Sequence, residues 1–446
     1  MMLPSLRVAS ASVVLCVAVL AGSTALGKDP ALACSDICDT LTATTCAVTT
    51  VHEIAAGADI DCTGARDISL SGSGELRVHD GQFAVRGKSI TLGSGARIDA
   101  DCPQGFVPVG YRLIVDEDLI MVAASQAKLE ARCTKQGGRI VVDAGGDITI
   151  DALGADASGD APGAPGGAVR LAAGGTVSID ADLQASATQG AAAGGVVHVA
   201  GGTITVDAEL RARGSGTSTV ELPGGEIRLE AAGDVTVASG GGLNAGSAKG
   251  AGGIIGINAG GIADVRQPLK ATGTSASVGV GGSVGILADE IKVSADITVT
   301  GGRMGGTIAL QGLEGGVVVG TTAAAVLDAT GNTNQHGGTV SIASQGGDVV
   351  LGSSATVHAT GGSGAEGGRV IVDGVNVTTS SGTKLYADGA APAGGGEIEI
   401  TARAAMDLDG TVQANNQGSK TFIYKDTVPV IDTGITGYEL LQMGIL

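Results

Sequence analysis

The stretch Gly166–Ala181 reads GGAVRLAAGGTVSIDA and carries the pattern that organises the chain. Two glycines are followed by any residue, an apolar residue, any residue and a second apolar residue. Ten such doublets occur, at steps of 24 to 32 residues. They begin at Gly137, Gly166, Gly194, Gly224, Gly252, Gly281, Gly305, Gly337, Gly367 and Gly395. A fixed internal period takes precedence over the two or three ordinary domains that 446 residues suggest.

Each repeat contains about three short segments in which apolar and other residues alternate. In the stretch quoted above, Val169/Leu171 and Val177/Ile179 mark two segments, and Leu183 marks a third. Alternation at period 2 indicates strands. Glycine and β-branched residues oppose helix throughout. Each repeat is therefore predicted to be three short strands joined by three turns.

The repeats must stack in order to fold. Ordering a coil costs roughly 1–2 kcal/mol per residue in backbone entropy. Its six or so inward side chains return only roughly 1.5–3 kcal/mol each. We therefore predict an all-β, single-domain, right-handed parallel β-helix of three sheets, with ten regular coils plus several N-terminal ones. A β-propeller is the alternative, but its blades need four strands and 40 or more residues.

Composition narrows the class of protein. The 78 glycines accompany a mean hydropathy of +0.32 and 43% apolar residues, which argues against disorder. Glycine does not occupy every third position, so collagen is excluded. A net charge of −19 disfavours nucleic acid as a partner. Acidity at this level is compatible with binding Ca²⁺, and no other cofactor is predicted.

Residues 1–27 have the features of a secretory signal. Arg7 precedes the mostly apolar segment Val8–Leu20, and cleavage is expected after Ala25 or Gly27. The apolar run is too short for a good membrane span, so no transmembrane segment is expected after signal removal. The protein is therefore expected to be exported, to the periplasm, the cell surface or the medium.

Residues 28–136 form a cysteine-containing N-terminal cap with the first coils. All six remaining cysteines precede the first doublet, and export favours three disulfides among fifteen possible connectivities. They are Cys34, Cys38, Cys46, Cys62, Cys102 and Cys133. We interpret residues 101–136 as an insertion or loop pinned by a Cys102–Cys133 bridge. A zinc site using Cys34 and Cys38, and lipid attachment at Cys34, are the alternatives.

The regular repeats span residues 137–425, and residues 426–446 lose the pattern. We expect this tail to cap the open end of the stack, with one or two helical turns within 434–443. The repeat steps of 24 and 32 residues around Gly305 mark irregular coils. These irregular coils, from Gly281 to His336, are the first candidates for residues that the rod presents to a partner.

The repeats resemble those of a known family of β-helix proteins. The phrases in Gly137–Ala152 and Gly166–Ala181 are similar to the haemagglutination-type β-helix repeats of bacterial filamentous adhesins and autotransporter passengers. The resemblance covers roughly residues 54–425. It implies a pectin-lyase-like fold and a role in adhesion, in a shaft, or as an exported passenger. The chain is shorter than the large adhesins.

Few residues suggest catalysis or metal binding. Asp407 and Asp409 are spaced for one face of a strand, but turn and solvent roles are commoner for such residues. The segment Gly361–Glu366 approaches a calcium-binding repeat, with glutamate in place of aspartate. No catalytic residue is predicted.

One outward column carries positive charge. The residue between the two apolar positions is Arg170, His198 and Arg228 in three successive repeats, and stacking would place them about 5 Å apart. Like charges should repel there unless Glu226, Glu230 or a ligand compensates. We consider a small site for an anionic ligand at this column. From Gly256 to Ser341 the same column is smooth and suits packing against a partner.

The sequence therefore predicts an exported structural or adhesive β-helix protein of the bacterial surface, without catalysis. Its expected partners are cell-surface glycans or other surface proteins. A carbohydrate-active enzyme of pectin-lyase-like fold, acting as a polysaccharide lyase or hydrolase, is the alternative. A passive scaffold is a third possibility.

Overall fold

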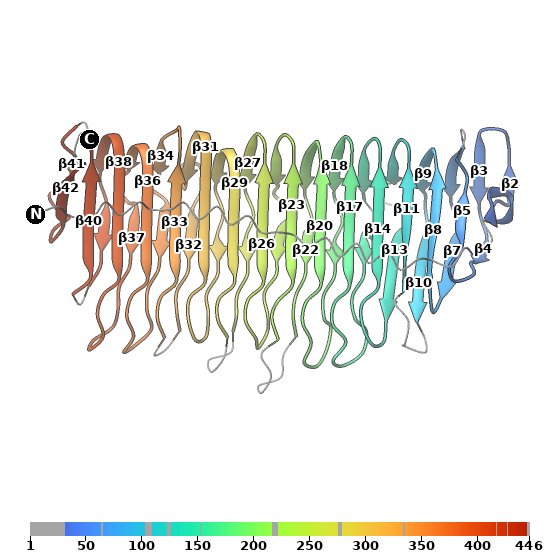
Figure 1. Cartoon of the computed structure of the whole chain (residues 1–446), viewed down its shortest axis with the longest axis horizontal. Helices are drawn as coiled ribbons and strands as arrows, with labels where there is room; N and C mark the ends of the chain where they lie inside the picture. Colours follow the sequence, from blue (N-terminus) through green and yellow to red (C-terminus); the bar gives the residue numbers. More distant parts are fainter. Residues whose placement is uncertain are drawn as a thin grey trace, which may run out of the picture.

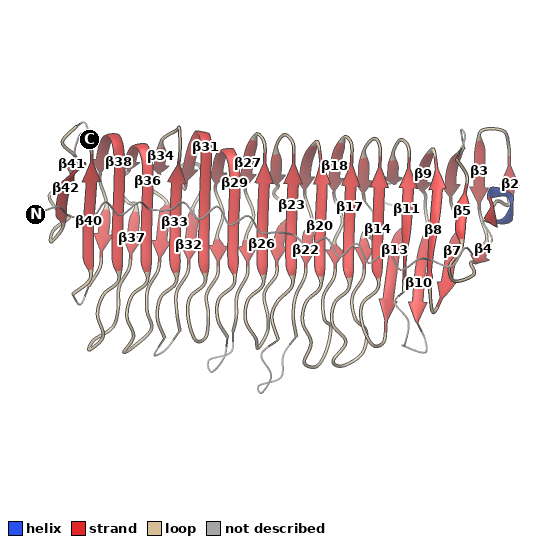
Figure 2. Ribbon diagram, in the orientation of Figure 1, coloured by secondary structure: helices blue, strands red, loops and turns tan. Residues whose placement is uncertain are grey.

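The computed structural model describes residues 32–443 except 64–65, 103–108, 123–125, 152, 216–221, 275–278, 333–334, 416 and 426. The signal predicted in residues 1–27 lies outside the described residues. The chain forms a parallel β-solenoid of about 13 turns, drawn as a long rod in Figures 1 and 2. The predicted β-helix is confirmed.

Each regular turn contributes one strand to each of three stacks, which are parallel except that β2 pairs antiparallel with β3. The first stack contains β1 (Leu32–Ala33), β5 (Asp59–Asp61), β8 (Gln82–Gly87), β11 (Gly110–Val115), β14 (Arg139–Ala144), β17 (Ala168–Ala173), β20 (Val196–Gly201), β23 (Glu226–Ala231), β26 (Ile254–Ala259), β29 (Ser283–Val293), β31 (Thr307–Val319), β33 (Thr339–Ser344), β36 (Arg369–Thr379), β38 (Glu397–Leu408), β40 (Ser419–Tyr424) and β42 (Glu439–Gln442).

The second stack contains β2 (Thr40–Leu41), β3 (Thr45–Val48), β6 (Asp67–Leu70), β9 (Ser89–Leu92), β12 (Leu119–Met121), β15 (Ile148–Ile150), β18 (Thr176–Ile179), β21 (Thr203–Val206), β24 (Val235–Val237), β27 (Ile262–Val265), the second halves of β29, β31, β36 and β38, β34 (Val349–Leu351) and β41 (Val430–Ile431). The third contains β4 (Val51–Glu53), β7 (Glu75–His79), β10 (Arg97–Cys102), β13 (Lys128–Cys133), β16 (Ala155–Asp156), β19 (Leu183–Gln184), β22 (Glu209–Arg211), β25 (Gly242–Asn244), β28 (Leu269–Lys270), β30 (Ile297–Thr298), β32 (Ala325–Asp328), β35 (Ala355–His358), β37 (Lys384–Tyr386) and β39 (Thr411–Gln413).

The first two stacks form one continuous 28-stranded sheet, and the third forms a 14-stranded sheet. They are joined because β29, β31, β36 and β38 run unbroken around the corner between them. In Figure 1 the chain advances from right to left, rises through the nearer strands and descends through the more distant ones. The coil is therefore right-handed, as parallel crossovers generally are.

The core is one column of stacked aliphatic side chains. Val169, Val197, Ile227 and Ile255 are neighbours in register on four successive strands, and all are 0% exposed. The same register repeats along the rod, so one hydrophobic cluster extends from Cys34 to Ile435. Each turn buries its apolar residues only because the next turn covers them.

The glycine doublets form a corner at which backbones touch. The N–H of Gly195 donates to the Ala185 carbonyl at 2.7 Å, which closes the loop that precedes the doublet. A Cβ on Gly195 would lie 2.0 Å from the Gly167 carbonyl oxygen of the preceding turn. The other doublets show the same short approach to neighbouring backbone. The repeat therefore requires glycine for steric reasons.

Two expectations about irregular segments are wrong. Residues 101–136 are not an insertion: β11, β12 and β13 make an ordinary turn in register with its neighbours. The tail does not form a helix either, because its described part adds β41 beside β38 and β42 beside β40. In both segments, hydrogen bonding to the neighbouring turn produces strands that the local sequence does not predict.

The short repeat step before Gly305 has a structural cause. The segment between β30 and β31 is only residues 299–306, and it carries the compact turn from Gly301 to Met304. The long step that follows comes partly from β31, which continues through an irregular corner at Leu313–Gly315. The length changes therefore fall at corners, and the register of the stacks is kept.

Candidate functional site

The predicted positive ladder lies on the outer face of the first stack. Arg170, His198 and Arg228 occupy directly adjacent positions on β17, β20 and β23. Neighbouring strands lie about 4.8 Å apart, so the three side chains share one narrow strip. The next position in the column is Gly256, whose missing side chain leaves the strip open on that side.

Two carboxylates compensate most of this charge. Arg228 Nε contacts Glu226 Oε1, and His198 Nε2 lies 3.3 Å from Glu230 Oε2. The His198 contact lacks hydrogen-bond geometry, so it is an ion pair only when the imidazole is protonated. Arg170 has no ion-pair partner among the described residues and is exposed. The ladder thus presents one uncompensated guanidinium.

A shallow hollow adjoins this ladder. Its lining includes Gly174, Gly201, Gly202, Glu230 and Asn258, from four successive turns. The floor is mostly backbone and small side chains, and Glu230 is the one carboxylate in its lining. An anionic ligand beside Arg170 would therefore meet a negative charge at the far side of the hollow.

A second charged site lies on the outer face of the third stack, and sequence reasoning missed it. Asp99, Glu130 and Asp156 are direct neighbours on β10, β13 and β16. Their side chains are only 18%, 12% and 15% exposed. Three carboxylates in one column repel one another, and partial burial strengthens that repulsion.

The environment shifts the titration of Asp99. Burial, followed by the charge of Glu130, raises the pKa of Asp99 from its usual value to about 6. Basic side chains surround the column: Arg77 Nε lies 3.9 Å from Asp99 Oδ2, and Lys128 Nζ lies 2.6 Å from Glu130 Oε1. Asp99 can therefore hold or release a proton near neutral pH, which is the property of a general acid or base.

The Asp99 column was hidden by the misinterpretation of residues 101–136 as a loop. Asp99 and Glu130 are 31 positions apart, and nothing in the local sequence relates them. The signal was nevertheless present, because Lys128–Cys133 has the same alternation as Arg97–Cys102. Aligning the cysteines Cys102 and Cys133 would have aligned the two strands.

The two other sequence candidates lie in turns and at a strand end. Asp409 Oδ1 accepts a hydrogen bond from the Gly410 N–H at 2.8 Å, in the turn that follows β38. Asp407 is exposed at the end of that strand. In the segment considered for Ca²⁺, Gly361 N–H donates to the Asp388 carbonyl, and Glu366 faces His336 Nδ1 at 3.6 Å.

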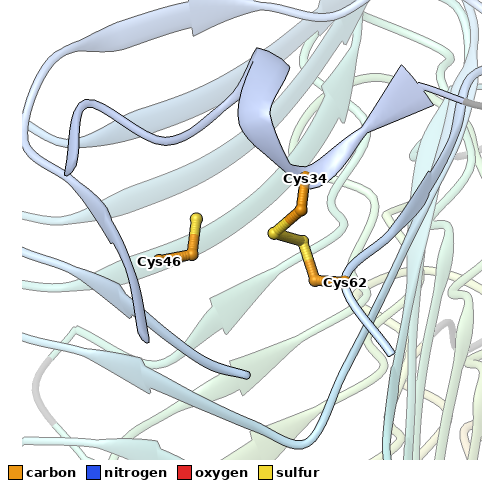
Figure 3. A group of neighbouring side chains, drawn as sticks. All are labelled: Cys34, Cys46 and Cys62. Atoms are coloured by element: carbon orange, nitrogen blue, oxygen red, sulfur yellow. A yellow bond between two sulfur atoms is a disulfide. The ribbon is translucent and has the colours of Figure 1, made fainter. Parts of the chain in front are cut away.

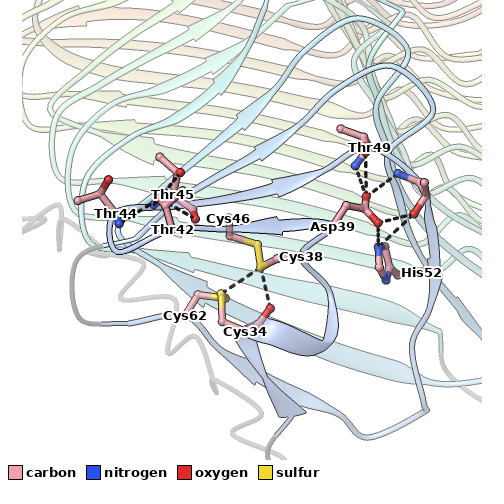
Figure 4. The surroundings of a disulfide bond; sticks show 11 residues. Cys34, Cys38, Asp39, Thr42, Thr44, Thr45, Cys46, Thr49, His52 and Cys62 are labelled. Carbon is pink, nitrogen blue, oxygen red and sulfur yellow. Dashed lines mark hydrogen bonds and ion pairs between the residues drawn. A yellow bond between two sulfur atoms is a disulfide. The ribbon is translucent and has the colours of Figure 1, made fainter.

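The six cysteines form three disulfides at the N-terminal end. The pairs are Cys34–Cys62, Cys38–Cys46 and Cys102–Cys133, so the proposed third bridge is confirmed. Figure 4 shows the first two pairs packed together, with Cys34 Sγ 3.6 Å from Cys38 Sγ, and Figure 3 shows Cys46 beside the Cys34–Cys62 bridge. The sulfur atoms of Cys34, Cys46 and Cys62 lie within 4.8 Å of one another, but all are engaged in disulfides. The alternative zinc site therefore lacks free thiolates.

Asp39 fastens the cap next to these disulfides. Its carboxylate accepts hydrogen bonds from the backbone N–H groups of Thr49 and Thr50 at 2.6 and 2.9 Å. His52 Nε2 lies 3.3 Å from Asp39 Oδ1 (Figure 4). The bond from the Thr49 N–H is the main cause that lowers the pKa of Asp39 well below its usual range. The cap is thus held by disulfides and by the hydrogen bonds that Asp39 accepts from Thr49 and Thr50.

Comparison of the chain with protein-family models, curated proteins and solved structures finds no match in any of the three. Among the described residues, no helix has the length and apolar character needed to cross a membrane.

Proposed function

We propose that this chain is an exported structural or adhesive β-helix protein of the bacterial surface, which acts as a rigid shaft that displays loops and has no catalytic role. The observation that carries the proposal is a ridge of stacked loops. The ridge comprises the described parts of the segments that connect each third-stack strand to the next glycine doublet, and it forms the lower edge in Figure 1.

The base of the ridge is regular. Gly159 forms a parallel bridge with Cys133 and with Ala187, and Gly273 forms bridges with Ser247 and Gly301. These bridges extend the stacking of the coils into the loops, so the loops are held in a row. A row of loops at a fixed spacing suits multivalent attachment, because weak contacts add when geometry allows simultaneous engagement.

The tips of the ridge vary from turn to turn. Exposed tip residues include Pro162, Thr188, Lys249, Arg303 and Glu366. A constant base with changing tips is the arrangement expected when a scaffold presents recognition residues on loops. It agrees with the resemblance to filamentous adhesins, and surface glycans or surface proteins are the proposed partners.

The test combines cell fractionation with binding. The chain should be recovered outside the cytoplasm and should bind glycans on an array or intact cells. Replacing the exposed tip residues Lys249 and Arg303 with serine should reduce binding while thermal unfolding stays unchanged. Cytoplasmic recovery, or binding that survives the loss of all exposed tips, would contradict the proposal.

The alternative is a polysaccharide-degrading enzyme, and the Asp99 column is the observation that favours it. The half-buried Asp99, with its pKa of about 6, lies in register with Glu130, so an acid and a carboxylate are neighbours on one face. Release of reducing or unsaturated sugar ends from acidic polysaccharides, lost in both Asp99→Asn and Glu130→Gln, would favour this function over the shaft.

A further inference from the structure

Four cysteines crowd together at the N-terminal end of the rod, and we call Cys34, Cys38, Cys46 and Cys62 the cysteine cluster. Cys34 Sγ lies 3.6 Å from Cys38 Sγ, although the two atoms belong to different disulfides. The sulfur atoms of the other trio, Cys34, Cys46 and Cys62, lie within 4.8 Å of one another (Figures 3 and 4). Each sulfur atom therefore has a second one close by, besides the one to which it is bonded.

The two bridges of the cluster differ in their access to solvent. Cys38 is partly exposed, whereas the other three members are at most 3% exposed. Thiol–disulfide exchange requires a thiolate to reach the sulfur atom that it attacks. An external thiol can therefore attack the Cys38–Cys46 bridge, through Cys38, while burial shields the Cys34–Cys62 bridge from direct attack.

We propose that the cysteine cluster exchanges disulfide partners within the folded cap, with Cys38 as the point of entry for an external dithiol. The dithiol first reduces the Cys38–Cys46 bridge. Its own two sulfur atoms become a disulfide, and Cys38 and Cys46 become thiols. The dithiol thus supplies the two electrons that this step needs.

The second step passes the reduction to the buried bridge. The Cys38 thiolate attacks Cys34 Sγ, which lies 3.6 Å away. The Cys34–Cys38 bond forms as the Cys34–Cys62 bond breaks, and Cys62 leaves as a thiolate. One thiolate is consumed and one is released, so this step needs no further reductant.

The chain around Cys34 favours the new pairing. Cys34 begins the short 3₁₀ helix η1 (Cys34–Asp36), and the Ile37 N–H donates to the Cys34 carbonyl at 3.3 Å. Cys38 follows this turn directly, 4 positions after Cys34. The turn therefore holds the two sulfur atoms in contact before any exchange takes place.

The third bridge differs from the cluster. Cys102 and Cys133 are each 2% exposed and occupy paired positions on β10 and β13. Among the described residues, neither belongs to a group of three or more side chains of the kinds that bind metals. The Cys102–Cys133 bridge therefore has no neighbouring disulfide with which to exchange.

The exchange changes how the outermost segment of the rod is attached. Residues 32–41 carry the two cysteines that the new bridge joins, and the native bridges tie this segment to Cys46 in β3 and to Cys62 just after β5. The new bridge closes the segment on itself and ties it to neither. Two residue pairs with β5, two with β3 and the hydrogen bonds of Asp39 then remain. The exchange therefore loosens the N-terminal cover of the core and leaves the later turns as they are.

Mapping of free thiols tests the exchange. Cys46→Ala leaves Cys38 without a partner, and the free thiol should then be found at Cys62 as well as at Cys38. Cys102→Ala is the matched control, because it also leaves one unpaired cysteine, and its free thiol should stay at Cys133. The share of free thiol that moves to another cysteine should be at least about tenfold greater in Cys46→Ala than in Cys102→Ala.

Acid stops the exchange by protonating thiolates, so each folded sample is acidified, unfolded, alkylated and mapped by peptide mass spectrometry. Partial reduction of the parent chain needs no variant and therefore does not depend on how well Cys46→Ala folds. Brief treatment with a limiting amount of dithiothreitol should give chains with a Cys34–Cys38 disulfide and free thiols at Cys46 and Cys62. The Cys102–Cys133 bridge should stay intact in the same chains.

Three results would overturn the proposal. Free thiols confined to Cys38 and Cys46 in the partly reduced parent would show that the buried bridge takes no part. Equal movement of the free thiol in Cys46→Ala and Cys102→Ala would assign the exchange to general opening of the chain. A cluster that resists every concentration of dithiothreitol while the chain stays folded, as followed by circular dichroism, would exclude Cys38 as a point of entry.

Discussion

Replacing Gly195 by alanine should destabilise the rod far more than replacing a glycine on a flat face. The added Cβ would lie 2.0 Å from the Gly167 oxygen and 2.7 Å from the Ala185 oxygen. Both oxygens are fixed, since the first accepts the Val196 N–H at 2.9 Å and the second accepts the Gly195 N–H at 2.7 Å. The methyl group can fit only if the corner moves.

The magnitude combines two effects. Overpacking by one methyl group costs about 1–3 kcal/mol. Moving the corner weakens two backbone hydrogen bonds, at about 1 kcal/mol each. We therefore expect Gly195→Ala to lower the free energy of unfolding by about 3–5 kcal/mol, and local stacking at the neighbouring turns should weaken with it.

Gly285→Ala is the matched control. Gly285 occupies an outward strand position, and a Cβ there would meet nothing within 4 Å. Alanine should be neutral or should stabilise by roughly 0.5–1 kcal/mol, because glycine is unfavourable within strands. Guanidinium unfolding followed by circular dichroism compares the two variants with the parent chain. Equal stabilities for Gly195→Ala and Gly285→Ala would refute the steric role of the doublet.

Three further predictions concern the charged and disulfide-bonded regions. The pKa of Asp99 in the folded chain, about 6, is above its usual value. Ionisation of Asp99 therefore destabilises the fold as pH rises from the ordinary aspartate pKa, and the loss is complete above about pH 6. Asp99→Asn should thus raise the unfolding free energy by about 1–3 kcal/mol at neutral pH, and the gain should disappear as pH falls towards the ordinary aspartate pKa; a gain that persists in acid would contradict this. Replacing both Cys102 and Cys133 with serine removes a cross-link between residues 31 positions apart and should lower the free energy of unfolding by about 2–4 kcal/mol. Thermal unfolding of the oxidised parent and the variant measures the loss, and equal stability would show that strand pairing alone fixes this turn. In binding assays with acidic glycans, Arg170→Ser should weaken retention more than Arg228→Ser, because Glu226 already compensates Arg228; unchanged binding in both variants would remove the ladder as a site.

The architecture was predictable from the sequence because the repeat acts at every turn. An inward residue such as Val169 meets a residue of the same kind 28 positions later, so periodicity alone specifies the neighbour. The segment 101–136 defeated this reasoning because it lacks the doublet, although Leu129 and Ala131 continue the inward column at 0% exposure. The spacing of the glycine doublets therefore could not identify this turn, whereas the alternation of apolar residues in its strands could have done so.

The charged sites were harder to predict, because they depend on pairs of residues from different turns. Arg170, His198 and Arg228 were visible, since the doublet aligns them, and Glu226 and Glu230 were foreseen as compensating groups. The Asp99 column requires the register of an irregular turn and the burial of each carboxylate, neither of which local sequence contains. In a solenoid, the features that distinguish one turn from the next therefore emerge only after the stack is assembled.

At the C-terminal end, too, pairing between turns overrides what the local sequence predicts. Local composition of residues 434–443 suggested helical turns, yet the open edge of β40 pairs with Glu439–Gln442 in preference to leaving its N–H and C=O groups free. Among the described residues, β42 in turn has no strand on its other side, and Leu440 is 40% exposed. Each coil that covers its predecessor creates the need for another covering layer. A stack of this kind must therefore end in a dedicated cap, as it does at the disulfide-bonded end, or in a contact with another surface.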